Sequence, residues 1–408
     1  MASKLDVFLA VCLYPGLSAA GIVKKIGKPH ASYNSAYRLL RELKAEGLAS
    51  EENGLFSASK TKNARTLASL VYFCFKNGID YNKAVSKKTA EFVKVGLEKG
   101  KISGMPFDAK TVRRIMGQLS RGGFAIVESR KPFSCRIVPS HFTRLLAEYF
   151  FGKIKVRCPS LPDCLDEALV DSALEKQFSA YKRLEKEKFA FDETGFIYVS
   201  LSLEGNTLTL SETEKIIRQN IAPASKPFRD AQQVLDYKKA LDGFVFSADA
   251  ITRESVLEFH KVAMGSLAAG AGKFRAGNVR IKGNPEFKTP DWRELPARLG
   301  DFFSGANAPQ GKKASAAAIV ARAAFLHNEF QRIHPFIDGN SRTARAIFLK
   351  ALAMNGFPPI KLQVGFSDQY MALTKLSKER DDKKFALLMK QIALENLKHL
   401  ARKMEYGF

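Results

Sequence analysis

The chain has 408 residues, of which 46% are hydrophobic and 26% charged. This is ordinary globular composition, and the length suggests roughly two to four domains. The net charge of +24 is uneven: residues 1–157 carry 28 Lys and Arg against 11 Asp and Glu, whereas the rest carry 37 against 30. No apolar run is long enough to span a bilayer, so no membrane partner is expected. The basic front part favours a polyanionic partner such as nucleic acid; the alternative is a solvated basic surface.

The five cysteines are scattered and odd in number, and no Cys-x-x-Cys pair occurs. Cys158 and Cys164 flank PSLPD, a spacing too wide for the usual zinc pair. This usage argues against a disulfide framework or a structural zinc site and favours a reducing compartment, so we expect a cytoplasmic protein. The apolar start is not expected to be a signal peptide, because Asp6 interrupts it and it runs directly into a helical pattern.

Residues 1–60 are predicted to form three helices and a hairpin. Helical spacing of apolar residues predicts the first helix: Leu5, Phe8, Leu9, Cys12 and Leu13. LSAAGIVKKIG gives a short second helix, and ASYNSAYRLLRELKAEG gives a third that ends at Gly47. LASEENGLFSAS then predicts two strands around an Asn-Gly turn, an order typical of a winged helix. The third helix would contact DNA through Tyr33, Asn34, Arg38 and Arg41.

The next segments are predicted to be a helical connector over 61–104, a second winged-helix-like module over 105–157 and a Pro-containing linker over 158–195. In the second module, basic residues lie on a helix and at a hairpin tip, which suits phosphate contact. The candidate contacts are Arg113, Arg114, Arg130 and Lys131. Winged helices also serve as protein-binding or purely structural modules, and that alternative stays open.

The stretch HPFIDGNSRTAR starts at residue 334 and gathers one His, one acid, one Asn and two Arg around a Gly-Asn turn. A buried helix is predicted upstream, over ASAAAIVARAAFLHNEFQRI, and it ends at His334 because Pro335 cannot continue it. A new helix is predicted to start near Asn340. The N–H groups at its start, together with the positive end of its dipole, form an anion site.

Arg342 and Arg345 lie three residues apart and share one face of this new helix. Two guanidinium groups beside a cluster of backbone amides suit a di- or triphosphate. Asp338 is placed to hold a Mg²⁺ that bridges the phosphates, and His334 is the candidate general base. The alternative is a capped helix with surface charges.

The pattern His-Pro-Phe-x-(Asp/Glu)-Gly-Asn-x-Arg-x-x-Arg resembles the signature of the Fic family, whose members transfer AMP from ATP to protein hydroxyl groups. The matching positions are His334, Pro335, Phe336, Asp338, Gly339, Asn340, Arg342 and Arg345. Upstream, GAGKFRAGNVRIKG resembles the family's Arg-x-x-x-Val-x-Ile segment, a hairpin called the flap that aligns the target peptide by strand addition. The flap residues are Val279, Arg280, Ile281 and Lys282. With FSDQYMALTKL downstream, which resembles the closing helices, the resemblance covers about residues 200–395.

The resemblance implies a role for each of these residues. His334 deprotonates a Ser, Thr or Tyr hydroxyl of the target, which attacks the α-phosphorus of ATP in line while pyrophosphate leaves. Asp338 holds Mg²⁺, and Arg345 clamps the γ-phosphate. Phosphate charge is stabilised by the loop and helix start, with the nucleotide-binding residues Gly339, Asn340, Ser341, Arg342 and Arg345. The presence of both arginines favours AMP transfer over the kinase-like branch of the family.

Two positions depart from the family, because Ser341 and Ala344 replace common glycines. Ser341 lies in the anion loop, where its hydroxyl either adds a donor or crowds the phosphates. Neither change removes a catalytic group, so activity is expected to survive.

SLSLEGN at 200–206 resembles the family's inhibitory pattern, (Ser/Thr)-x-x-x-Glu-(Gly/Asn), with Ser200, Glu204 and Gly205. In relatives this Glu pairs with the second Arg and blocks the γ-phosphate position, so an inhibitory helix near 200–207 would pair Glu204 with Arg345. The alternative is an ordinary helix start, since SETE at 211–214 is itself a capping box.

The sequence thus predicts a mainly α protein, with an all-helical Fic domain over 196–400 that carries a small β-hairpin flap and follows α/β winged-helix modules. Its function is expected to be autoinhibited AMP transfer. The alternative is a DNA-binding transcriptional regulator whose Fic domain is a nucleotide sensor. The expected partners are ATP, Mg²⁺, a protein target (the chain itself included), double-stranded DNA and a second copy in a homodimer.

Overall fold

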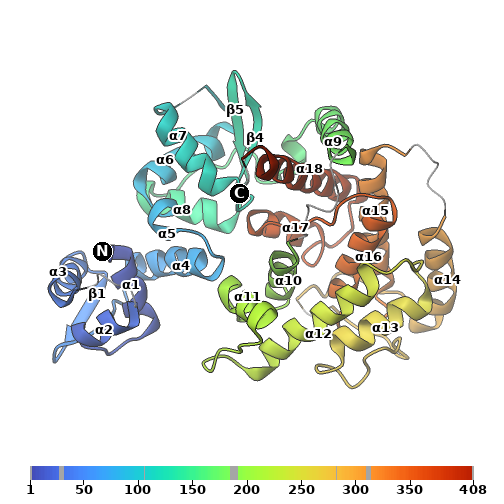
Figure 1. Cartoon of the computed structure of the whole chain (residues 1–408), viewed down its shortest axis with the longest axis horizontal. Helices are drawn as coiled ribbons and strands as arrows, with labels where there is room; N and C mark the ends of the chain where they lie inside the picture. Colours follow the sequence, from blue (N-terminus) through green and yellow to red (C-terminus); the bar gives the residue numbers. More distant parts are fainter. Residues whose placement is uncertain are drawn as a thin grey trace. The chain divides into compact units, whose positions relative to one another are not determined.

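The computed structural model describes residues 2–26, 32–104, 106–183, 192–281, 283–308 and 314–406. The chain divides into two compact units, Met1–Arg157 and Cys158–Phe408 (Figure 1). Each unit has its own buried apolar core, and helices dominate both.

The front part of the first unit is three helices followed by a hairpin. In chain order the elements are α1 (Lys4–Leu13), α2 (Ala19–Ile26), α3 (Tyr33–Ala45), β1 (Ala49–Glu52) and β2 (Leu55–Ala58). Ser3 and Asp6 form a capping box at the start of α1. Asn53 and Gly54 make the tight turn of the hairpin, with φ values of 50° and 74°. Phe56 of β2 is buried in this core, where β2 packs against α1.

The remainder of the first unit surrounds a three-stranded antiparallel sheet. Its elements are α4 (Lys62–Lys76), α5 (Tyr81–Ala84), α6 (Lys87–Lys99), β3 (Ile102–Ser103), α7 (Ala109–Leu119), β4 (Ala125–Arg130), β5 (Phe133–Ile137) and α8 (His141–Phe151). The strand order is β3-β5-β4. Residues 61–104 are therefore more than the expected connector, because α6 packs against α8 and β5 and β3 adds a strand to the sheet.

The second unit is helical, and none of its described residues lies in a strand. Its elements are η1 (Pro162–Cys164), α9 (Glu167–Lys182), α10 (Glu193–Ser202), α11 (Leu210–Gln219), α12 (Phe228–Val245), α13 (Arg253–Met264), η3 (Trp292–Glu294), α14 (Leu295–Ala306), α15 (Ala316–Ile333), α16 (Asn340–Met354), η4 (Val364–Phe366), α17 (Ser367–Leu373) and α18 (Asp382–Tyr406). The mainly α fold class, with small hairpins, is confirmed. Among the described helices, none is both long and apolar enough to cross a membrane.

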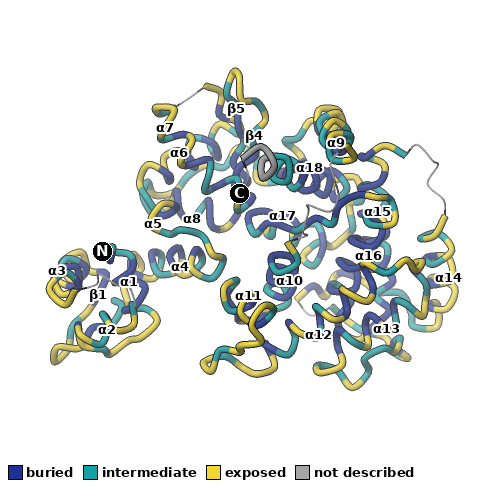
Figure 2. The backbone as a smooth tube through the Cα atoms, in the orientation of Figure 1, coloured by how far each residue is buried: buried dark blue, intermediate teal, exposed yellow. Residues whose placement is uncertain are grey.

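Helix α16 is buried along most of its length at the centre of this unit (Figure 2). It packs against α15, α12, α13 and α10. Because neighbours surround it, even its charged residues Arg342, Arg345 and Lys350 are at most 5% exposed. Charges held this deeply need partners.

The segment expected to be a linker over 158–195 contains a packed helix. α9 lies against α18 and α15, and its Glu167 and Asp171 pair with Lys390, which is 5% exposed. The cysteine usage argued against a disulfide framework, but the turn at η1 brings Cys158 and Cys164 together as a disulfide, with Cα atoms 6.5 Å apart. The prolines before α9 predicted a linker, but packing of its apolar side stabilises a helix there.

Alanine substitutions at two glycines, Gly96 and Gly117, test the packing of α6 on β5. A Cβ at Gly96 would lie 2.3 Å from Cγ1 of Ile137, whereas one at Gly117 in α7 meets no atom within 4 Å. We expect Gly96→Ala to destabilise the first unit by about 1–3 kcal/mol through overpacking. Gly117→Ala should stabilise it by about 0.5–1 kcal/mol, because alanine loses less chain entropy in a helix.

The measurement is urea unfolding followed by circular dichroism. The single tryptophan, Trp292, lies in the second unit, so its fluorescence serves as the unaffected control. Equal effects of the two substitutions would contradict the close approach of α6 to β5.

Candidate active site

The turn between α15 and α16 bends the chain sharply with two residues of positive φ. His334 caps α15 at φ 48°, ψ 57°, and Gly339 precedes α16 at φ 83°. This confirms the predicted helix, turn and helix start. A left-handed conformation costs a non-glycine residue about 1–2 kcal/mol, so contacts around His334 must hold it there. The first N–H groups of α16, a helix of 15 residues, point into the turn.

The loop between these two residues is closed by buried side chains. The Asn340 amide donates to the Phe336 carbonyl at 2.8 Å and accepts from the Phe336 N–H at 2.9 Å. The Asn340 side chain, expected to stabilise phosphate, is thus engaged in shaping the loop. The amide groups and the dipole at the start of α16 remain available to an anion.

His260 of α13 supports the same loop from beneath. The N–H of Gly272 donates to Nδ1 of His260 at 2.9 Å, so the ring proton sits on Nε2, which donates to the Asp338 carbonyl at 2.9 Å. The ring stacks on Phe336 at 3.6 Å. Burial lowers the pKa of His260 to about 4, and it is therefore neutral at physiological pH. A neutral imidazole with a fixed tautomer holds the loop backbone in place.

The first arginine, Arg342, is buried beside the exposed carboxylate of Asp338. Its NH2 lies 3.3 Å from Oδ1 of Asp338, and its Nε, although buried, has no hydrogen-bond partner among the described residues. A buried donor without an acceptor is costly and rare in folded proteins. It marks a position where an incoming anion would supply the acceptor.

The second arginine, Arg345, is paired with the predicted inhibitory segment. Its Nε donates to Ser200 Oγ at 2.7 Å, and its NH2 donates to the Ser200 carbonyl at 3.0 Å and to Glu204 Oε1 at 2.8 Å. The expected Glu204–Arg345 contact is thus present. α10 ends at Ser202, so Glu204 lies in the following turn with Gly205 at φ 94°, rather than in a helix over 200–207. The carbonyl end of α10 therefore also faces the cation.

A relay of hydroxyl groups connects the two arginines. Ser200 Oγ donates to the Tyr237 hydroxyl at 3.0 Å, and Tyr237, which is fully buried on α12, donates to the Arg342 carbonyl at 3.2 Å. Each of the two hydroxyl groups, of Ser200 and of Tyr237, accepts one hydrogen bond and donates one. α10, α12 and α16 are thereby held in one register.

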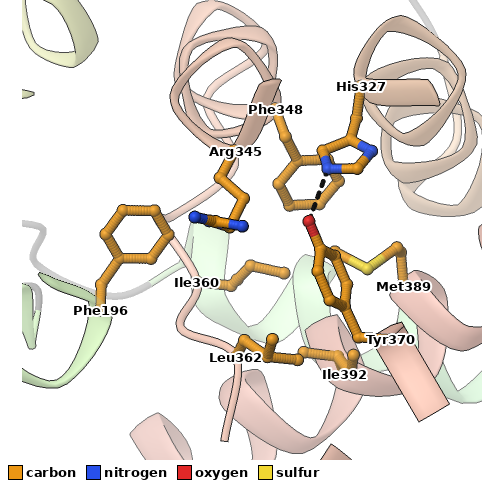
Figure 3. Close-up of a pocket in the computed structure, with 9 residues that line it drawn as sticks. All are labelled: Phe196, His327, Arg345, Phe348, Ile360, Leu362, Tyr370, Met389 and Ile392. Atoms are coloured by element: carbon orange, nitrogen blue, oxygen red, sulfur yellow. Dashed lines mark hydrogen bonds between the residues drawn. The ribbon is translucent and has the colours of Figure 1, made fainter. Parts of the chain in front are cut away.

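On its other side, Arg345 borders a cavity of about 20 Å³ with mostly apolar walls (Figure 3). Phe196 and Tyr370 line this cavity with it, and the Tyr370 hydroxyl lies 2.8 Å from Nε2 of His327. Burial lowers the pKa of His327 to about 3, so its imidazole is neutral at physiological pH. The hydroxyl of Tyr370 also interacts with Arg345 on this side.

The candidate base, His334, has one ring nitrogen engaged. Nδ1 faces the Gln331 carbonyl at 3.4 Å, which places the proton on Nδ1 and leaves Nε2 with a free lone pair. Burial lowers the pKa of His334 to about 4, and the positive charges of Arg380 and Arg275 act in the same direction. The imidazole is therefore neutral at pH 7, as a general base must be.

The predicted flap follows Arg275 as two irregular segments, referred to as its arms. Val279, Arg280 and Ile281 lie on the first arm, and Lys282 lies outside the described residues. Thr289 of the second arm donates through Oγ1 to the Val279 carbonyl at 2.9 Å. No strand is assigned within 275–281 or 283–291, so this contact between the arms is made by a side chain rather than by a backbone ladder.

The candidate DNA contacts lie in the first unit and are solvent-exposed. Tyr33, Asn34, Arg38 and Arg41 are on α3, Arg113 and Arg114 on α7, and Arg130 and Lys131 at the turn between β4 and β5. Tyr33 stacks on Tyr37 at 5.9 Å, and Arg38 pairs with Glu42 at 3.4 Å.

Three residues that support the site escaped the sequence analysis. Tyr237 and His260 lie on helices α12 and α13, where they resemble ordinary core positions. Arg275 opens the Arg-x-x-x-Val-x-Ile segment, the one signal that could have drawn attention to it. Their importance depends on which backbone groups they meet, and that is decided by tertiary packing.

The residues present fit a magnesium ion only if substrate phosphates supply most of its ligands. The Asp338 side chain is 61% exposed, and the part of the chain that is described has no cluster of three or more His, Cys, Asp or Glu able to hold a metal. Mg²⁺ commonly binds through one or two carboxylates together with substrate phosphates and water. A single carboxylate is sufficient if a phosphate chain supplies the rest.

Comparison with known proteins agrees with this geometry. Residues 250–352 match the model of the Fic/DOC family. The chain is 29% identical over 218 residues to the protein adenylyltransferase Fic of Drosophila willistoni, covering 52% of this chain and 42% of that protein. It is 30% identical over 211 residues to the protein of the same name from Aedes aegypti, covering 50% and 40%. The chain thus spans about two fifths of the length of these relatives.

Two solved structures share the fold. Fic-1 from C. elegans superposes with a TM-score of 0.51 at 21% identity, over 59% of this chain and 74% of that one. A Fic family protein from Desulfovibrio desulfuricans G20 gives a TM-score of 0.50 at 20% identity, over 59% and 75%. At this identity the likeness concerns the fold alone.

The close packing of the loop is tested by Gly339 and Gly356. Both have positive φ, but a Cβ at Gly339 would lie 2.9 Å from His260 Nε2 and from Met264, whereas one at Gly356 meets nothing within 4 Å. We expect Gly356→Ala to cost only the left-handed backbone, about 1–2 kcal/mol. Gly339→Ala should cost about 2–4 kcal/mol, because overpacking adds to the strain.

Urea unfolding of each variant, followed by the fluorescence of Trp292, measures the difference. If the two alanine variants were equally stable, the seating of the loop on His260 and Met264 would be wrong.

Proposed function

Because this chain carries a Fic/DOC-family domain over residues 250–352, we propose that it transfers AMP from ATP to a hydroxyl group of a protein. The proposal rests on one observation above all: the buried Nε of Arg342, which lacks an acceptor beside the start of α16. Its relatives named protein adenylyltransferase Fic support the same chemistry.

The triphosphate is bound where the helix dipole and both arginines meet. The N–H groups at the start of α16 and the free donor of Arg342 bind the α- and β-phosphates, and Arg345 binds the γ-phosphate. These donors are buried or fixed by the backbone before substrate arrives, so they need little reorganisation as charge develops. We expect this preorganisation to supply most of the rate enhancement.

The target hydroxyl loses its proton to Nε2 of His334, the ring nitrogen with the free lone pair. Its oxygen forms a bond to the α-phosphorus while the bond to the pyrophosphate oxygen breaks in line. The products are the AMP ester and pyrophosphate. Val279, Arg280, Ile281 and Lys282 of the flap would align the backbone of the target segment.

Asp338 would hold the magnesium ion through its exposed carboxylate. When bound, the ion neutralises charge on the phosphates and orients them. Asp338 Oδ1 also accepts from the Gly339 N–H at 2.6 Å, which fixes the direction of the carboxylate.

In the state described here, Glu204 occupies the arginine that the γ-phosphate needs. Arg345 is buried and Glu204 is half-buried, with side chains 6% and 17% exposed. Lys375 adds a second, longer contact to Glu204 at 4.0 Å. Nucleotide and carboxylate compete for the same guanidinium, and the protein is therefore autoinhibited.

Labelled ATP provides the test. With [α-³²P]ATP and Mg²⁺, Glu204→Gly and Glu204→Gln should incorporate at least about 10-fold more label into protein than wild type, because a charge-assisted hydrogen bond is worth about 1.5–3 kcal/mol. His334→Ala in either background should abolish labelling. [γ-³²P]ATP should give no label, since pyrophosphate leaves.

Glu214→Gln is the matched control for Glu204→Gln. It makes the same chemical change in an exposed ion pair with Arg218 and should leave labelling unchanged. Binding of ATP without any labelling in Glu204→Gly would overturn AMP transfer and favour the alternative function, a regulator whose Fic domain senses nucleotide. Equal labelling of Glu204→Gln and wild type would contradict the proposed autoinhibition by Glu204.

For the first unit we propose binding of double-stranded DNA through two winged-helix modules. The order of helices and hairpins supports this, as do exposed cations on α7 and at the β4–β5 turn. Arg113, Arg114, Arg130 and Lys131 make no ion pair with another described residue. Cations free of acidic neighbours are available for phosphates.

A fluorescent duplex titrated at several salt concentrations tests this. The double variant Arg113→Ala/Arg114→Ala should bind more weakly and lower the slope of log K against log salt by about 2, because each arginine is expected to neutralise one phosphate. The control is Lys83→Ala/Lys94→Ala, which removes the same charge from residues paired with Asp80 and Glu98. Equally weakened binding in both variants would show a general charge effect instead of an interface.

A further inference from the structure

Arg275 is a buried cation whose hydrogen-bond partners are backbone carbonyl groups. It is 4% exposed. Nε donates to the carbonyl of His334 at 2.9 Å, NH1 to that of Gly277 at 2.9 Å, and NH2 to that of Pro290 at 2.7 Å. Its backbone N–H donates to the Pro335 carbonyl at 2.8 Å.

The nearest carboxylate does not neutralise this charge directly. Asp291 accepts instead from the side-chain amide of Asn278 at 3.0 Å and from the backbone N–H of Arg293 at 2.9 Å. Arg275 is thus held by carbonyl dipoles, in a fork that needs three separate N–H directions. Lysine, with a single ammonium group, cannot reproduce this planar arrangement.

One end of the fork fixes the base. His334 is left-handed at φ 48°, and Nε of the Arg275 guanidinium donates to its carbonyl, while the backbone N–H of Arg275 donates to the carbonyl of the next residue, Pro335. The direction of the His334 carbonyl depends on the ψ of His334, so this hydrogen bond helps to hold the residue in the conformation that places its imidazole. Loss of the fork would allow His334 to relax toward ordinary backbone angles and carry its ring out of line.

The other end of the fork fixes the flap. Gly277 and Pro290 stand at the two ends of the segment in which Thr289 meets Val279. Binding both carbonyls to one guanidinium holds the two ends together. The base and the flap are therefore attached to the same rigid planar group.

We propose that Arg275 is a positioning residue that aligns the base His334 with the flap, so that a hydroxyl on a bound target segment arrives at the imidazole. The inference rests on the proposed AMP transfer for its kinetic meaning. Arg275 is too buried to contact substrate, and it acts through the backbone of His334 and the ends of the flap.

The experiment uses the full chain with Glu204→Gly, so that labelling is measurable, and adds Arg275→Lys or Arg275→Gln. Lysine keeps the charge and loses the fork, whereas glutamine loses both. The matched control is Arg293→Lys, an exposed arginine that neighbours Asp291 at 3.5 Å. Self-labelling is followed as a function of ATP concentration and pH, and ATP binding is measured separately by calorimetry.

We expect both Arg275 variants to lower the rate at saturating ATP by about 10- to 100-fold, because a misplaced base loses alignment. The ATP affinity should change less than about 2-fold, since Arg342, Arg345 and α16 are untouched. Arg293→Lys should match the parent. A loss of ATP affinity as large as the loss of rate would overturn the proposal, and so would an unchanged rate in Arg275→Lys.

The pH dependence of labelling distinguishes the effect of Arg275 on the position of His334 from the effect of its charge. His334 must be neutral, so activity is lost as pH falls through its pKa of about 4. The charged groups that act on it are Arg380, Arg275 and Asp338. Arg275→Lys should keep this acid limb at a lower rate, whereas Arg275→Gln should move it to higher pH. An acid limb shifted equally in both variants would contradict this assignment, because lysine keeps the positive charge that glutamine loses.

A second readout does not depend on AMP transfer. Hydrogen exchange followed by mass spectrometry should become faster in Arg275→Lys in the peptides over 275–281, over 283–291 and over 334–340 together. If Glu204→Gly incorporates no label but exchange rises in all three segments, AMP transfer is contradicted while the positioning role of Arg275 is supported. Faster exchange in only one segment would overturn that positioning role. Arg275→Gln carries no buried charge, and it serves for this measurement if the lysine variant does not fold.

Discussion

The buried guanidinium of Arg345 is the constraint around which the second unit is arranged. A cation at 5% exposure cannot stay there without compensating groups. Ser200, Glu204 and the carbonyl end of α10 supply them in the state described here. In the proposed reaction a phosphate takes over that role. The contact of Glu204 with Arg345 therefore compensates the buried positive charge, and it is also the proposed means of inhibition.

The same constraint explains why α10, α12 and α16 are linked by hydroxyl groups. Nε of Arg345 donates to the Ser200 hydroxyl, and that hydroxyl donates to the Tyr237 hydroxyl. Tyr237 in turn donates to the Arg342 carbonyl. A buried chain that satisfies each donor has one good arrangement, and this gives the helices a single register. Nε of Arg342 at the helix start differs, because it is buried without an acceptor among the described residues, as is Nε of Arg380.

Around the turn, backbone strain and its supports come from different parts of the chain. His334 takes a left-handed conformation, and its carbonyl is held by Arg275, from 59 residues earlier. His260 holds the next part of the loop through the Asp338 carbonyl. Local sequence creates the bend through Pro335 and Gly339, while distant side chains fix its exact path.

How far the sequence could predict the fold depended on the pattern in each segment. α15, the turn and α16 were foreseen almost to the residue, because Pro335, Gly339 and the paired arginines leave few alternatives. α1 was foreseen as a helix but not its buried side. Leu13 is 36% exposed and Val7 and Val11 are buried, because a helix with apolar residues all around has no periodicity to orient it. α9 was missed because the proline signal before it concealed a helix that gains its stability by packing on α18.

The sequence by itself determined the chemistry of the site: one His, one acid and two Arg at a helix start, with a Glu and a Ser upstream. The spacing of the two arginines sets the helix face that they share, whereas Glu204 and Ser200 were expected only from the family resemblance. Only the tertiary structure decided that Tyr237, His260 and Arg275 support them, and that Asn340 closes the loop with its side chain. A buried polar group takes its meaning from the partner it meets, and those partners lie tens of residues away along the chain.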